Sequence, residues 1–319
     1  MFASLVDSDN FEQFIMGCEV MHTITQPLTS NGFTLSNATN RLGWLTPTDP
    51  NQPMDALRQQ YREQGYLWLK GILDRDEILA FRRRYFAAMA PSGILAEGTD
   101  PVEGISSGGP VDHELHNKLL MEIVRSAAYE AFCLQPRVRC FFEEFLQGEV
   151  YLHKRKIIRS TSPGAAFSTP AHYDLVYLRG GADTVCTAWI PIGDTPVEMG
   201  GLVYLEGSDQ VGRRMEAEFA ARNADLSPEE RISAYNKNMA EGGWVTKNLP
   251  EMAERFNTRW LMADYEAGDM MVHSAYMIHA ATANMDASWM RLSTDIRYQR
   301  VRDEIDARWA NHWTLNDML

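Results

Sequence analysis

The sequence predicts a mainly β protein with flanking helices, in which strands far apart in the chain lie side by side. The first observation is His172-Tyr173-Asp174, because residues two apart on an extended strand point to the same face. The second is His279, which follows His172 by 107 positions and must arrive on a distant strand to join that face. A closed or double-sheet β fold brings such strands together.

Prolines and helix-capping residues predict the elements before this motif. Residues 1–53 contain prolines and little periodicity, and we expect an N-terminal extension that wraps the core or covers a binding site. A helix should begin later in the chain, with Asp74 as its N-cap and Glu77 at capping-box spacing. Residues 54–319 are expected to be one domain, because large all-β folds exceed 200 residues.

The residue types of the motif indicate a metal site. Two imidazoles and one carboxylate on one face of an ion leave adjacent positions open, the arrangement that suits non-haem Fe(II). By itself a His-x-Asp triplet is weak, since it is more often a surface pair or a buried core histidine. Its interpretation depends on the segments around it.

Those segments occur in a recognisable order. They are residues 168–177, 187–192, 198–208 and 268–273, followed by His279, Asn284, Arg291 and Ser293. This ordered set resembles the phytanoyl-CoA dioxygenase family over roughly residues 54–300. The resemblance implies a double-stranded β-helix, the jelly-roll core of cupin-like proteins, with residues 61–73 as its opening strand. One corner departs from the family, because Glu206-Gly207-Ser208-Asp209 stands where many members have Pro-Gly-Ser-His.

Carried over residue by residue, the resemblance implies a ligand set. His172, Asp174 and His279 would bind iron, Arg291 the distal carboxylate of 2-oxoglutarate, and Trp189, Thr169 and Ser293 would lie beside that co-substrate. An arginine suits the role because its planar fork donates two parallel hydrogen bonds and keeps its charge. Arg297, six residues after Arg291, shares its strand parity.

The implied activity is a dioxygenase that uses Fe(II), 2-oxoglutarate and dioxygen. It would hydroxylate a C–H bond of a small organic metabolite and release succinate and carbon dioxide. Desaturation, epoxidation or rearrangement in secondary metabolism is an alternative on the same scaffold. A non-enzymatic metabolite-binding protein is another, against which the intact ligand set counts. The carboxylate of Asp174 disfavours halogenation, because halogenating relatives lack it.

A polar stretch at residues 211–260 is predicted to be a helical insert. Ser227-Pro228-Glu229-Glu230 within it is typical of a helix start, with proline and acids in the first turn. We expect a lid or a subunit contact that would form a homodimer. Solvated helical decoration remains open.

Two further clusters have both a functional and a structural interpretation. His273 lies six residues before His279 and is expected either to support the metal site from behind or to fill the core. Lys154-Arg155-Lys156 would hold an anionic substrate or the co-substrate, or would be a solvated charge run.

Composition excludes some partners. A net charge of −13 without a basic stripe argues against nucleic acid. No apolar run reaches the length that a membrane span needs. The four cysteines include no C-x-x-C pair and the N-terminus does not resemble a secretory signal, so a cytoplasmic protein is expected. With few basic residues to hold phosphates, a neutral or weakly charged substrate is favoured over a CoA thioester.

Overall fold

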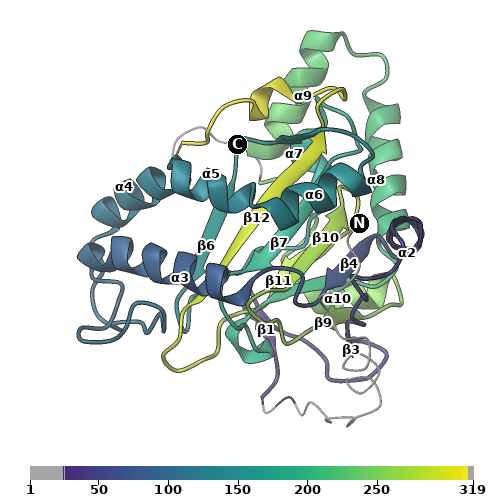
Figure 1. The fold of residues 1–319 in the computed structure, drawn as a ribbon. Helices are drawn as coiled ribbons and strands as arrows, with labels where there is room; N and C mark the ends of the chain where they lie inside the picture. The colour runs from purple at the N-terminus through teal and green to yellow at the C-terminus, as the bar shows by residue number, and fades with distance from the viewer. Residues whose placement is uncertain (1–23, 25, 241, 315–319) are drawn as a thin grey trace.

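Two β-sheets packed face to face form the centre of the molecule, and helices cover the outer face of the larger sheet (Figure 1). The computed structural model describes residues 24, 26–240 and 242–314. The strands in these residues are β1 Thr29–Ser30, β2 Phe33–Thr34, β3 Leu42–Trp44, β4 Tyr66–Leu69, β5 Val150–Leu152, β6 Ile157–Thr161, β7 Cys186–Pro191, β8 Leu202–Leu205, β9 Trp260–Met262, β10 Met270–Ser274, β11 His279–Ala281 and β12 Arg291–Arg300.

The strand order is that of a jelly roll. The larger sheet has the order β4-β10-β7-β12-β5, and β6 pairs with the same edge of β12 as β5. The smaller sheet has the order β11-β8-β9-β3, and all its pairs are antiparallel except β3 with β9. Neighbouring strands are far apart in sequence, as the prediction of a double-stranded β-helix required, and that prediction is confirmed.

Strand β12 shows how the larger sheet separates two environments. Leu292 and Ile296 face the helices and belong to the core cluster between helices and sheet. Arg291, Asp295 and Arg297 alternate with them and therefore face the interior between the two sheets. An apolar face packs against the helices, and a row of polar side chains lines the space between the sheets.

Helices flank the strands in the described residues. They are α2 Met54–Gln64, α3 Arg75–Met89, α4 His113–Val124, α5 Ala127–Cys133, α6 Pro136–Phe145, α7 Leu175–Leu178, α8 Asp209–Arg222, α9 Pro228–Ala240 and α10 Leu249–Arg255. Helices α3 to α6 lie across the outer face of the larger sheet (Figure 1). Phe86 of α3 and Phe142 of α6 are fully buried there. Burying such aromatic rings supplies much of the apolar area that stabilises this layer.

The opening segment differs in part from its prediction. Residues 61–64 end helix α2 instead of beginning a strand, and only Tyr66–Leu69 form β4. Gly65 separates the two elements with a φ of 80°, a left-handed conformation that suits glycine at a helix end. The predicted cap of the next helix is confirmed, because an Asp74 carboxylate oxygen accepts hydrogen bonds from the backbone of Asp76 and Glu77.

The predicted insert is helical. Helices α8, α9 and α10 span most of residues 209–255, and α8 already begins at Asp209. Ser227 and Glu230 form the reciprocal hydrogen bonds of a capping box at the start of α9. The helix start predicted from these residues is therefore confirmed, whereas the role of the insert stays a prediction.

The extension contains more regular structure than predicted. Residues 1–23 and 25 lie outside the described residues, but Leu42–Trp44 form β3, which pairs in parallel with β9. The edge of β9 would otherwise present unpaired backbone groups, and β3 satisfies them. Among the described residues, no helix is both long and apolar enough to cross a membrane.

Candidate metal centre and co-substrate site

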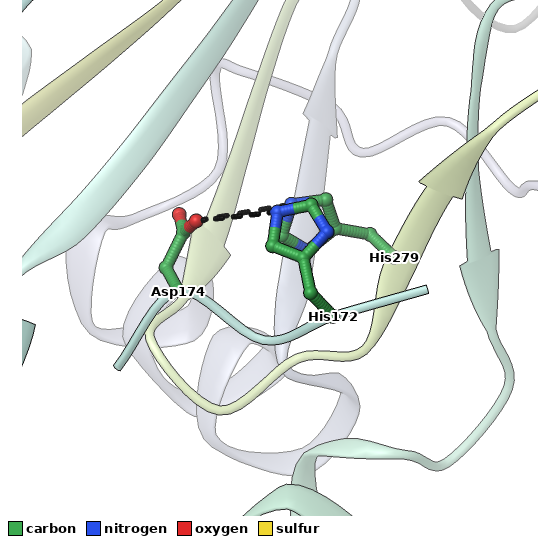
Figure 2. A group of neighbouring side chains, drawn as sticks. All are labelled: His172, Asp174 and His279. Atoms are coloured by element: carbon green, nitrogen blue, oxygen red, sulfur yellow. Dashed lines mark ion pairs between the residues drawn. The ribbon is translucent and has the colours of Figure 1, made fainter. Parts of the chain in front are cut away.

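His172, Asp174 and His279 converge in the interior of the jelly roll (Figure 2). Their donor atoms all lie within 4.8 Å of one another, and all three side chains are buried. His172 and His279 are direct neighbours across an antiparallel bridge, in which each backbone N–H donates to the carbonyl of the other. Strand pairing therefore brings the two distant histidines together, as the sequence predicted.

Backbone carbonyls orient both imidazoles. Nδ1 of His172 lies 2.8 Å from the carbonyl of Pro170, and Nδ1 of His279 lies 2.9 Å from that of Met277. A carbonyl only accepts, so Nδ1 must carry the proton in each ring. Each Nε2 then presents a lone pair, at 3.7 Å from Oδ1 of Asp174 for His172 and at 3.9 Å for His279. Carbonyl partners of this kind are typical of metal-binding histidines.

Asp174 is placed differently from the prediction. The extended segment ends at His172, and Asp174 has helical dihedral angles, φ −65° and ψ −30°, at the start of α7. Its carboxylate still lies near both imidazoles. A strand-to-helix turn, and not simple strand alternation, places the third donor.

A network of donors holds the Asp174 carboxylate. Nη2 of Arg297 donates to Oδ1 at 2.9 Å, and the hydroxyl of Thr187 donates to Oδ2. Nε2 of His273 lies 3.3 Å from Oδ2, and its Nδ1 forms a hydrogen bond of 2.8 Å with the Tyr204 hydroxyl. His273 thus supports the metal site from behind, the first of the two interpretations given to it.

Burial and charge set protonation states that suit a metal. Burial alone would raise the pKa of Asp174, but Arg297, His273 and His279 hold that pKa well below its usual range. Burial lowers the pKa of His172, although Asp174 opposes this, and burial together with His172 and His273 lowers that of His279 further. At neutral pH the carboxylate is ionised and the imidazoles are neutral, the forms that metal binding requires.

Arg291 lines the same narrow cavity as His172 and His279. Its side chain is buried, Nη2 donates to the Thr161 hydroxyl at 2.8 Å, and Nε has no partner among the described residues. Burial, reinforced by Arg159, lowers the pKa of Arg291 to about 10. A buried guanidinium with an unsatisfied donor fits an anion that completes its hydrogen bonds.

The other predicted co-substrate residues lie around the same space. Trp189 and Thr169 line the narrow cavity beside the histidines. Ser293 is fully buried on the same strand face as Arg291, and its hydroxyl has no partner in the part of the chain that the structure describes. This donor set fits Fe(II), and the unsatisfied arginine and serine fit the carboxylate of 2-oxoglutarate.

Residue patterns left part of the surroundings of Asp174 without an assigned role. Arg297 could have been assigned from its strand parity with Arg291, but nothing in the sequence indicates that it contacts Asp174. Thr187 and Tyr204 lie in segments that carry the family resemblance, but the sequence assigned neither of them a role. Their roles arise from strand register, because Arg297 is paired with Thr187, and His279 with Tyr204.

A jelly roll that holds two buried histidines and a carboxylate beside a buried arginine defines an Fe(II)- and 2-oxoglutarate-dependent oxygenase. The family model "Phytanoyl-CoA dioxygenase (PhyH)" matches residues 61–292, and the chain belongs to this family.

Two curated relatives are similar to the chain over most of their length. The 1-deoxypentalenic acid 11-beta-hydroxylase of Streptomyces exfoliatus is 28% identical over 255 residues, which cover 77% of this chain and 81% of the relative. The enzyme of the same name from Streptomyces arenae is 26% identical, with coverage of 77% and 81%.

Among solved structures, EctD from S. alaskensis with bound Fe has a TM-score of 0.51 at 13% identity, covering 87% of this chain and 89% of that one. The non-heme alpha ketoglutarate dependent carbocyclase SnoK from nogalamycin biosynthesis has a TM-score of 0.50 at 19% identity, with coverage of 86% and 92%. These likenesses support the fold.

Proposed function

We propose that His172, Asp174 and His279 bind Fe(II), that Arg291 binds the distal carboxylate of 2-oxoglutarate, and that the enzyme hydroxylates a C–H bond of a small metabolite. The observation that carries this proposal is the convergence of the three donors beside a cavity that two of them, His172 and His279, line together with Arg291. Trp189, Thr169 and Ser293 would complete the co-substrate site.

Bound iron with 2-oxoglutarate supplies the oxidising power for a C–H bond when dioxygen is present. The residues of this chain contribute geometry and protection from water. Backbone carbonyls aim the imidazoles, and Arg297 with Thr187 and His273 holds Asp174. All of these side chains are buried, which favours ordered chemistry over side reactions with solvent.

The substrate would occupy a second cavity of about 370 Å³, which His172 also lines. The two curated relatives are hydroxylases of 1-deoxypentalenic acid, which supports hydroxylation of a small molecule in secondary metabolism. Met239 of α9 and Trp244, just after it, line this cavity, which supports a lid role for the insert over mere decoration. The homodimer contact remains a prediction.

Anaerobic titration with Fe(II) and 2-oxoglutarate tests the cofactor assignment. We expect a weak visible charge-transfer band that needs both additions, disappears in His172→Ala and weakens in Arg291→Ala. Lys118→Ala, on the exposed side of α4, is the control and should leave the band unchanged. A folded wild-type protein without a band at any concentration would overturn the proposal.

A further inference from the structure

The cavity beside His172 combines aromatic walls with guanidinium groups. Tyr177, Trp244 and Trp309 line it, together with Arg159 and Arg297. None of the described residues that line the cavity is an aspartate or glutamate. Guanidinium groups without a carboxylate in the lining favour an anion, even though Arg297 and Arg159 each already contact one aspartate behind the wall.

Arg297 gives the strongest indication of an anion-binding site in this cavity. Its side chain is 5% exposed, and only Nη2 has a described hydrogen bond, to Asp174. Nε and Nη1 are buried without a partner among the described residues. Leaving charged donors unsatisfied in the interior is costly, so two such atoms on a side chain that lines the cavity indicate a missing acceptor.

The surroundings hold Arg297 in place. Its guanidinium lies 5.0 Å from the ring of Trp309, and Arg155 lies 5.0 Å from the same ring. The Trp309 indole is fixed by a hydrogen bond of 2.8 Å to the carbonyl of Tyr177. Because stacking and the bond to Asp174 restrict the guanidinium, it loses little freedom when it binds an anion.

Arg159 provides a second cation at the same wall. It belongs to β6 directly opposite Ser293 of β12, and its Nε donates to Asp295 at 3.0 Å. Its side chain is 39% exposed and also borders the narrow cavity near Arg291. It therefore lies between the two cavities and can contribute charge to a ligand in either.

We propose that the cavity binds a compact apolar molecule that carries one carboxylate, held by Arg297 and Arg159 while its hydrocarbon part lies against Tyr177, Trp244 and Trp309. The volume of about 370 Å³ is at the small end of ligand sites, which suits a molecule of one or a few rings. The inference rests on the proposed function, since the carboxylate would be fixed beside the metal donors. It narrows the expectation of a neutral or weakly charged substrate to a monoanion.

The test uses matched acids and amides as probes. Cyclohexanecarboxylate, adamantane-1-carboxylate and the corresponding carboxamides are titrated calorimetrically into the anaerobic protein with saturating Fe(II) and 2-oxoglutarate. We expect at least one acid to bind about 10-fold or more tightly than its amide, since a hydrogen bond to a charged group contributes about 1.5–3 kcal/mol. Arg297→Gln should remove this preference, and Arg159→Gln should reduce it several-fold.

Arg83→Gln is the control, because Arg83 forms an exposed ion pair with Asp100 away from the cavity. It should retain the full preference. Equal binding of acid and amide, binding of neither acid, or a preference that survives both cavity variants would overturn the inference. So would an acid that displaces 2-oxoglutarate and bleaches the visible band. The band reports the iron site and calorimetry reports the cavity, so failure of the proposed function and failure of this inference are distinguishable.

Discussion

Two arginines on one strand face show how partners decide the chemistry of identical side chains. Arg291 and Arg297 both lie on β12, both are 4% exposed, and both line the narrow cavity. Arg291 has a neutral hydroxyl partner, and burial lowers its pKa to about 10. Burial also acts against the charge of Arg297, but Asp174 and Asp295 raise its pKa above the ordinary value.

The different partners of Arg291 and Arg297 suit the two arginines to different roles. Arg297 is already tied to a metal-site carboxylate, so part of its charge serves to orient Asp174. Arg291 has no described carboxylate partner and keeps an unsatisfied donor. Its guanidinium can therefore form an ion pair with an incoming anion. Under the proposed function, the same strand carries one arginine that orients Asp174 and another that would bind the co-substrate. Four predictions test this contrast.

Removing Asp174 should have the largest effect, because it takes a metal donor away and leaves Arg297 without its carboxylate. We expect Asp174→Ala to abolish Fe(II) binding and to lower 2-oxoglutarate turnover by more than the roughly 100-fold that loss of an outer partner costs. Metal titration and succinate release measure it, with Asp100→Ala on the surface as the control. Normal iron binding by Asp174→Ala would refute the ligand assignment.

Arg291→Gln should come next. The variant loses the charge and the fork, and we expect KM for 2-oxoglutarate to rise by about 100-fold, the equivalent of about 2.7 kcal/mol. Arg291→Lys keeps the charge without the fork and should show a smaller rise. The contrast between the two arginines fails if Arg291→Gln leaves KM within 3-fold of wild type.

His273→Gln probes the support behind Asp174. We expect Fe(II) to bind roughly 10-fold more weakly, because loss of an outer hydrogen bond lets a metal ligand move. Tyr204→Phe removes only the next bond in the chain and should weaken binding less. Both dissociation constants follow from the visible band. An unchanged affinity in His273→Gln would show that Arg297 and Thr187 suffice to hold the carboxylate.

Ile296→Val tests the opposite face of β12 and should have the smallest effect. Ile296 is fully buried against the helices, next in sequence to Arg297. We expect a loss of about 1 kcal/mol in unfolding free energy with unchanged iron and 2-oxoglutarate affinities. Urea unfolding and the band titration measure the two quantities. A shift in 2-oxoglutarate affinity would mean that the two faces are coupled.

Much of the local structure was predictable from short stretches of sequence. The wrong predictions also concern short stretches, at residues 61–64 and at Asp174. The Asp74 and Ser227 caps were predictable because capping involves residues only two or three apart. Residues 61–64 were assigned to a strand, but the chain continues α2 until Gly65, because packing on the sheet outweighs weak strand propensity. The turn that places Asp174 was also missed, since a strand pattern does not show where the strand stops.

By itself, the sequence determined the residue types and order of the donors, the alternation that divides β12, and the family to which the chain belongs. The covalent periods of strands and helices encode these features locally. Only the tertiary structure decided that Arg297 holds Asp174, that His273 and Thr187 share the same carboxylate, and that arginines border a cavity of about 370 Å³. Asp174 and Arg297 are 123 residues apart in sequence. Such contacts depend on strand register and sheet packing, which no local pattern specifies.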